Sequence, residues 1–198
     1  DRPSRNPVVG DAMNRNAIVT LNTLGMLGIT GVLFMGVVFQ FALGELPCPL
    51  CLLQRIGFAA VMFGFMLNVI YGPQQRHYGV ILIAALFGAA VSLRQISLHV
   101  IPGTPGYGSP ILGYHYYTWA FLIFAMTIIG VAVLLALWNR AWDRDAMHTD
   151  TTTTGLAGLG KLACLLAVAV VLLNVVLTFV ECGPFQYPDN PVDYWMFD

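Results

Sequence analysis

Charged side chains are scarce in this sequence. Asp, Glu, Lys and Arg make up 10% of its 198 residues, while 58% of the residues are hydrophobic. Together with a mean hydropathy of +0.74, this composition is typical of a protein that crosses a membrane several times, and it excludes an ordinary water-soluble domain. No segment of roughly 20–50 residues repeats, which excludes a repeat architecture. Nucleic acid is not expected as a partner.

Long apolar runs predict an all-α membrane helical bundle. Each run reaches the roughly 20 residues that a bilayer crossing needs, and the first is too long, with the wrong flanks, for a cleaved signal peptide. We expect one membrane domain over residues 1–198, with a four-helix core, a fifth transmembrane helix and a tail over residues 181–198. The five predicted spans are Ala17–Leu43, Leu50–Tyr71, Tyr78–Val100, Tyr116–Trp138 and Leu156–Val180.

The basic residues predict how the chain is oriented. Neither lysine nor arginine occurs in Gly44–Pro49, in Ile101–His115 or in the tail from Glu181. Seven of the nine basic residues fall on the opposite side, and the other two lie within spans. Because basic residues are concentrated in cytoplasmic segments, we expect a cytoplasmic N-terminus and an outward-facing tail. The seven are Arg2, Arg5, Arg15, Arg76, Arg140, Arg144 and Lys161.

A CxxC motif, Cys48-Pro49-Leu50-Cys51, lies between the first two spans on the predicted outer side. Such a pair can close a disulfide, bind a metal or cycle between dithiol and disulfide. A helix start and a nearby arginine both stabilise a thiolate, and Arg55 lies one turn beyond Cys51 on the same helix face. The sequence therefore predicts a reactive, outward-facing pair of thiols.

The two remaining cysteines differ in position. Cys164 and Cys182 are 18 residues apart in the fifth predicted helix and its outer end, a separation of about 27 Å along a helix. A disulfide between them is excluded, because it needs Cα atoms within about 7 Å. We interpret Cys164 as a packing residue. For Cys182 two interpretations stay open: a thiol that takes part in the chemistry, or a buried unpaired thiol.

Polar residues near the outer ends of the third and fourth predicted spans are further candidates. Arg94, Gln95 and His99 end the third span, and His115 opens the fourth. Ionisable groups inside a span are costly and usually functional, although Arg94 is also close enough to the helix end to extend into the interface. The aromatic residues of 114–119 are expected to form an interfacial belt without a catalytic role. The histidines at 77 and 148 are expected to be solvated.

These residues suggest exchange of electrons and protons with a lipid-soluble quinone. A thiolate donates electrons, an arginine stabilises negative charge on a ring oxygen, and a histidine or glutamine binds the other oxygen. Two alternatives stay open. One is a haem- or metal-bearing electron carrier that uses His99 and His115, or a zinc site of Cys48, Cys51, Cys182 and a histidine. The other is an accessory subunit of a larger membrane assembly, with a structural CxxC.

The sequence resembles the disulfide bond formation protein B family of bacterial inner membranes over roughly Ile18–Trp138. The resemblance rests on the CxxC motif, on Arg55 four residues after Cys51, and on Arg94 and His99. It implies a thiol–disulfide oxidoreductase whose CxxC passes electrons to bound ubiquinone or menaquinone, with Cys51 and Arg55 beside the ring and His99 near it. It also implies a soluble periplasmic, thioredoxin-like thiol oxidase as partner.

One departure from the family pattern is clear. Members usually carry a second cysteine pair in the loop between their third and fourth helices, whereas Ile101–Pro110 has no cysteine here. We therefore expect Cys48 to meet the partner and Cys51 to pass electrons to quinone, with Cys182 serving the thiol chemistry and Cys164 not. Arg55 is expected to tune electron transfer and to contribute little to folding.

Overall fold

Five long helices and one short 3-10 helix form the computed structural model, which describes residues 15–101, 103–104, 106–138, 156–184, 187 and 194–197. The described residues contain no strand, so the predicted all-α fold is confirmed. All five long helices are long and apolar enough to cross a membrane. The elements are α1 (Arg15–Leu43), α2 (Pro49–Tyr71), α3 (Gln75–His99), α4 (Tyr116–Ala136), α6 (Leu156–Cys182) and η1 (Trp195–Phe197).

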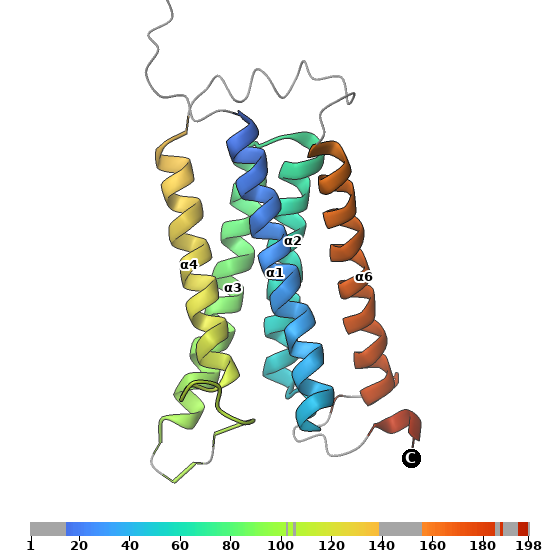
Figure 1. Cartoon of the computed structure of the whole chain (residues 1–198). Helices are drawn as coiled ribbons and strands as arrows, with labels where there is room; N and C mark the ends of the chain where they lie inside the picture. The colour runs from blue at the N-terminus through green and yellow to red at the C-terminus, as the bar shows by residue number, and fades with distance from the viewer. Residues whose placement is uncertain are drawn as a thin grey trace, which may run out of the picture.

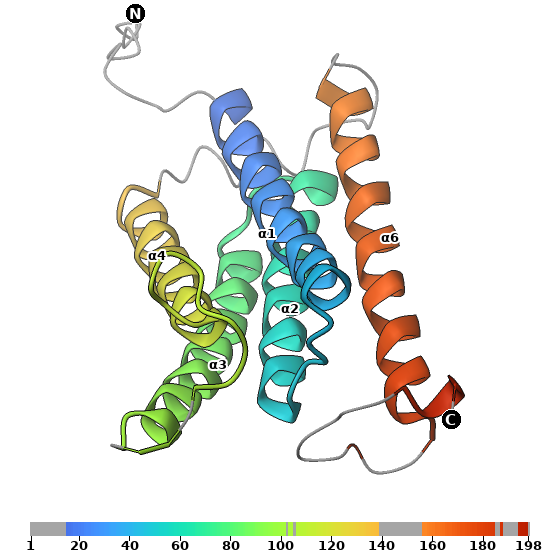
Figure 2. The same ribbon diagram turned by 60° about the horizontal axis from the view of Figure 1, so that its bottom comes forward.

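The helices are arranged as an open bundle around α2. Helix α2 packs against α1 and α3, α4 packs against α3, and α6 packs against α1 and α2. Helices α4 and α6 therefore lie on opposite sides of the bundle, and α1 and α4 are not closely packed against each other (Figure 1). We call the end that carries Cys48, the loop between α3 and α4, and the end of α6 the motif end; it lies at the bottom of Figure 1 and comes forward in Figure 2.

Several helix boundaries differ from the predicted spans by one to three residues. Helix α3 begins at Gln75, three residues before the predicted Tyr78, and α6 continues to Cys182. Apolar runs mark the length that faces lipid, whereas helical hydrogen bonding continues through polar residues at the ends. Glu181 and Cys182 thus belong to a helix and not to the tail. Four of the seven basic residues of the predicted inner side, Arg2, Arg5, Arg140 and Arg144, lie outside the described residues, so the orientation stays a prediction.

A buried polar network joins α1, α2 and α3 at the end opposite the motif end. The Asn22 amide donates to the Tyr78 hydroxyl over 2.7 Å, and the Asn68 amide donates to the Asn22 side-chain oxygen over 2.8 Å. His77 Nδ1 lies 3.0 Å from Asn68 Oδ1, and its side chain is buried. The expectation that His77 is solvated is therefore wrong, because α3 begins before this residue and turns it inward.

The middle of the bundle depends on a glycine. Phe58 of α2 stacks on Phe124 of α4 with ring centroids 4.0 Å apart. Gly88 of α3 leaves room for this pair, since a Cβ at position 88 would lie 2.1 Å from the Phe124 ring. The close approach of α2, α3 and α4 therefore requires a residue without a side chain here.

Replacing Gly88 by alanine is expected to destabilise the bundle. The added methyl group must displace the stacked Phe124 ring, and overpacking of this kind costs about 1–3 kcal/mol. Thermal unfolding of the detergent-purified protein measures the effect. Gly130→Ala in α4 is the matched control, because a Cβ there meets no atom within 4 Å and alanine favours the helix. Equal unfolding temperatures for the two variants would contradict the close packing described above.

Candidate active site at the CxxC motif

The CxxC sequence itself starts α2. Pro49 is the first helical residue, where its missing N–H costs nothing. Cys48 is the N-cap, and its sulfur accepts a hydrogen bond of 3.2 Å from the backbone N–H of Cys51. The motif therefore places Cys51 in the first turn of a helix, where the exposed N–H groups and the helix dipole stabilise a thiolate.

The side-chain amide of Gln95 contacts both sulfur atoms and is itself hydrogen-bonded to Gln54. The amide nitrogen of Gln95 in α3 lies 3.2 Å from Cys48 Sγ and 3.6 Å from Cys51 Sγ. Its oxygen accepts a hydrogen bond of 2.8 Å from the Gln54 amide in α2. This bond fixes the orientation of the Gln95 amide, so that its N–H groups point at the sulfurs. Gln95 was predicted to bind a cofactor; in the structure its side chain contacts the thiols.

The two thiols have different surroundings. All four cysteines are free in this structure, and Cys48 is buried whereas Cys51 is partly exposed. The hydrogen bond with Cys51 and burial raise the pKa of Cys48 above its ordinary value. Cys48 therefore holds its proton, and Cys51 is the sulfur that lies closer to Arg55 and faces a cavity.

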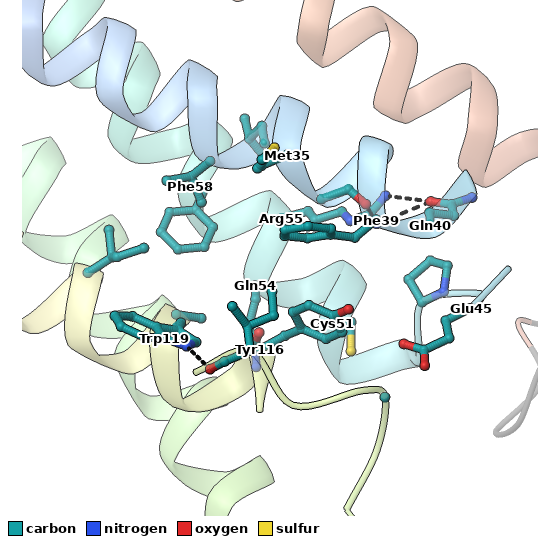
Figure 3. A pocket seen from close by; sticks show the side chains of 18 of the residues that line it. Met35, Phe39, Gln40, Glu45, Cys51, Gln54, Arg55, Phe58, Tyr116 and Trp119 are labelled. Atoms are coloured by element: carbon teal, nitrogen blue, oxygen red, sulfur yellow. Dashed lines mark hydrogen bonds between the residues drawn. The ribbon is translucent and has the colours of Figure 1, made fainter. Parts of the chain in front are cut away.

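That cavity, of about 570 Å³, lies between α1, α2, α4 and the loop before α4. Its wall is mostly apolar, with Phe58 at the α2 side and Gly28, Gly31 and Gly36 along α1. Figure 3 shows Cys51, Arg55 and Tyr116 around the same space. Helices α1 and α4 both line the cavity without packing closely against each other, and the lining residue Met35 is exposed.

Among the described residues, Arg55 is the one basic side chain that lines the cavity. Its Nη1 donates to Gln40 Oε1 and to Asn174 Oδ1, each over 3.1 Å. Its Nη2 donates to Gln40 Oε1 over 3.1 Å and to the Gly36 carbonyl over 3.3 Å. The guanidinium thus joins α1, α2 and α6, and all of its hydrogen-bond acceptors in the described part of the chain are neutral.

Tyr116 carries an unpaired hydroxyl group. This oxygen is buried, and no hydrogen-bond partner is found for it among the described residues. The Tyr116 side chain lines the cavity and its ring packs against Phe39, with centroids 5.6 Å apart. Since a buried hydroxyl without a partner costs free energy, the position is suited to a ligand with a hydrogen-bond acceptor.

The loop before α4 covers the cavity at the motif end. Tyr107 donates to the Leu46 carbonyl over 2.6 Å. Ser109 donates to the Glu45 carboxylate through its backbone N–H over 3.0 Å and through its hydroxyl over 2.6 Å. The Trp119 indole donates to the Ile111 carbonyl over 3.0 Å. These bonds fix the loop against the segment that leads into the CxxC motif.

The other predicted site residues lie outside the cavity wall. The imidazole rings of His99 and His115 both stack on the Tyr117 ring, with their centroids 5.2 and 5.3 Å from its centroid. Arg94 is exposed on α3. Cys182 ends α6 at the motif end, and its sulfur contacts the Thr178 carbonyl over 3.3 Å. No contact joins Cys182 to the CxxC among the described residues, so its part in the chemistry stays a prediction.

Cys164 lies on the side of α6 that packs against the core, as its interpretation as a packing residue requires.

Residues that the sequence analysis missed complete the site. Gln40, Gln54 and Asn174 are polar residues in otherwise apolar spans, which is the signal that could have identified them. Tyr116 was assigned to an interfacial belt, and helix spacing gives no sign that its hydroxyl reaches a cavity. Glu181 was placed at the start of the tail and was not considered for the site.

The metal alternative gains no support from the geometry. In the part of the chain that the structure describes, no three His, Cys, Asp or Glu side chains lie close enough together to hold a metal ion. His99 and His115 are separated by the Tyr117 ring that both contact.

Comparison with known proteins identifies relatives for the first part of the chain. Residues 19–107 match the family model described as "Disulfide bond formation protein DsbB". Disulfide bond formation protein B of Xanthomonas euvesicatoria pv. vesicatoria (strain 85-10) is 38% identical over 84 residues, 40% of this chain and 49% of the relative. The protein of the same name from Chromobacterium violaceum is 46% identical over 67 residues, 32% of this chain and 40% of the relative. No solved structure gives a significant match.

The chain spans about half the length of the curated relatives that it matches. The family match ends at residue 107, short of the predicted Trp138, so that α4 and α6 lie beyond it. It includes Cys48, Cys51, Arg55 and Gln95. The predicted resemblance is thus confirmed for residues 19–107, which contain the CxxC motif and match the disulfide bond formation protein B family model.

Proposed function

We propose that this protein is a membrane thiol–disulfide oxidoreductase that passes electrons from a thiol partner, through Cys48 and Cys51, to a membrane quinone. One observation carries the proposal. Cys51, Arg55 and Tyr116, whose buried hydroxyl has no hydrogen-bond partner among the described residues, line one apolar cavity between membrane-spanning helices. The family match over residues 19–107 supports the formation of disulfide bonds as the purpose of this chemistry.

The residues present fit a quinone. The cavity volume of about 570 Å³ falls in the range of about 300–1,000 Å³ that is common for small-molecule sites. A quinone ring carries two carbonyl oxygens that accept hydrogen bonds, and Tyr116 offers an unpaired donor. When bound, ubiquinone or menaquinone supplies an acceptor for two electrons and two protons.

The residues of the site have different roles in the proposed electron transfer. Cys48 keeps its proton, and the Cys51 sulfur faces the cavity in the first turn of α2. Arg55 stabilises negative charge on an acceptor beside it, and the Tyr116 hydroxyl orients a ring oxygen. Gln95 holds the two sulfurs together, so that Cys48 can attack Cys51 when electrons leave the pair.

The partner and location belong to the same proposal. A soluble periplasmic, thioredoxin-like thiol oxidase is the class of protein that would deliver electrons to Cys48, in a bacterial inner membrane with the motif end on the periplasmic side. The absence of lysine and arginine from the described connections at that end supports this orientation. Neither a haem carrier nor an accessory subunit is favoured by a specific observation.

Quinone reduction by the purified protein tests the function. The protein in lipid nanodiscs receives ubiquinone or menaquinone and a dithiol as the only source of electrons, and the quinone absorbance is followed. We expect reduction that needs both the dithiol and the protein. A rate equal to that of dithiol and quinone alone, with folded protein present, would overturn the proposal.

A further inference from the structure

Glu181 is a buried carboxyl group next to the proposed site. It lies in the last turn of α6, is 3% exposed, and belongs to a helix outside the family match. Two side chains of the described residues form hydrogen bonds with it: the Gln40 amide donates to Oε1, and the Tyr187 hydroxyl lies 2.9 Å from Oε2. A carboxyl group is rarely buried without a function or a direct ion pair.

The contacts of Tyr187 bear on the protonation of this carboxyl group. The Tyr187 oxygen lies 2.6 Å from the Pro47 carbonyl oxygen and 2.9 Å from Glu181 Oε2. The phenol carries a single proton, so with an ionised Glu181 it has to be shared between these two acceptors. A proton on Glu181 Oε2 would leave the phenol proton to Pro47 alone. The geometry therefore accommodates a neutral carboxyl group.

Glu181 is connected to Arg55 through one side chain. The oxygen of the Gln40 amide accepts from Arg55, and its nitrogen donates to Glu181. The oriented amide places its negative end at the cation and its positive end at the carboxyl group. A negative charge on Glu181 would thus be stabilised by Gln40 and Arg55, although the guanidinium makes no direct ion pair with it among the described residues.

The other titratable groups around Glu181 come from each neighbouring element. Helix α2 contributes Arg55, and α6 itself contributes Cys182. The tail contributes Tyr187 and Tyr194, and the loop before α4 contributes Tyr107. Arg55 is the only cation in this group, so the Cys51 thiolate and an ionised Glu181 compete to balance the same positive charge.

We propose that Glu181 stores the second proton of quinone reduction: it is neutral while Cys51 is a thiolate, and it ionises when Cys48 and Cys51 close to a disulfide. The inference rests on the proposed function. The Cys48 thiol and the Cys51 thiolate supply two electrons and one proton as the S–S bond forms, while a quinone substrate takes two electrons and two protons. The proton of Glu181 Oε2 completes the balance. The net charge is the same before and after, because the charge lost at Cys51 reappears at Glu181.

This exchange keeps the charge of Arg55 compensated in both states. Before oxidation the guanidinium faces a thiolate across the cavity wall, and afterwards it faces a carboxylate through Gln40. A buried cation without a counter-charge is costly, so the ionisation of Glu181 also favours the oxidised motif. Tyr187, hydrogen-bonded to both Glu181 and the Pro47 carbonyl, is a positioning residue for the stored proton.

Infrared difference spectroscopy of quinone-free protein tests the inference directly. The reduced motif is oxidised with ferricyanide, which accepts electrons without protons, and the oxidised-minus-reduced spectrum is recorded. We expect loss of a protonated-carboxyl C=O band, absent from the spectrum of Glu181→Gln and shifted in that of Tyr187→Phe. The band should persist in Glu45→Gln, which removes another carboxyl at the motif end. A wild-type spectrum without this band would show that the protonation of Glu181 does not change on oxidation and would overturn the proposal.

Counting released protons gives a second readout. Oxidation by ferricyanide should release two protons per wild-type motif, and one per motif in Glu181→Gln. Glu181→Asp, which keeps a carboxyl group, should restore the second proton if the glutamine variant is poorly folded. One proton from the wild type contradicts the inference. Neither measurement contains quinone. A failed quinone assay would therefore not change the interpretation of these two measurements, and a missing carboxyl signal would not change the interpretation of the quinone assay.

Discussion

Replacing Cys51 by serine is expected to reduce dithiol-dependent quinone reduction to the rate measured without protein. Cys51 is the sulfur that lines the cavity and lies closer to Arg55, so its loss removes the electron donor that faces the quinone. Quinone absorbance in nanodiscs measures the rate. Cys48 remains as a single thiol in this variant, so the motif can no longer close to a disulfide.

Cys164→Ser is the matched control for this experiment. It removes a free cysteine from α6, on the side that packs against the core and away from the cavity wall. Its turnover should equal that of the parent protein. Turnover retained in the Cys51 variant, or lost equally in the Cys164 variant, would contradict the assignment of roles within the motif.

Replacing Arg55 by alanine is expected to raise the KM for quinone by about 10-fold to 100-fold, because a hydrogen bond to a charged group is worth about 1.5–3 kcal/mol. Arg55→Lys should lie between the alanine variant and the parent protein, since lysine keeps the charge but lacks the planar fork of donors. The structure also changes the expectation that Arg55 contributes little to folding. Its loss leaves acceptors on α1 and α6 unpaired, so the unfolding temperature should fall as well.

Asn174→Ala separates the two effects of Arg55. This change removes one acceptor from the α6 side and leaves the guanidinium and its bonds to α1 in place. We expect a lower unfolding temperature with a KM close to that of the parent. If Asn174→Ala raised the KM as much as Arg55→Ala, the guanidinium would act by holding α6 and not by meeting the quinone.

The spans could be predicted closely because lipid imposes a simple requirement on each segment. A run such as Ala17–Leu43 is needed to cross the bilayer, and the same span is found in the structure. Helix ends follow hydrogen bonding instead, and so α3 extends back to Gln75 and α6 on to Cys182. Which helices touch was not predictable, since apolar residues surround most of each span and give no preferred packing face.

The candidate site could be predicted where its residues are near in sequence. Cys48, Cys51 and Arg55 share one helix start, so their spacing alone indicates a reactive thiol. Gln40 and Glu181 are 141 residues apart in the sequence, and they meet because α1 and α6 pack side by side. No local spacing encodes that contact. His99 and His115 were predicted as site residues because they lie near the outer ends of their spans, at the same level as the CxxC motif. The level of a residue in the membrane does not determine which way its side chain points.

The glycines along α1 have a consequence for how this cavity can evolve. At Gly28 and Gly31 no protein atom lies within 4 Å of the position that a Cβ would take. A mutation to alanine there would narrow the space without disturbing the helix packing and would favour the helix itself. One methyl group in an apolar pocket changes discrimination between ligands by about 1–3 kcal/mol. Single substitutions at these glycines would therefore change which ligand the cavity prefers, leaving the CxxC motif untouched.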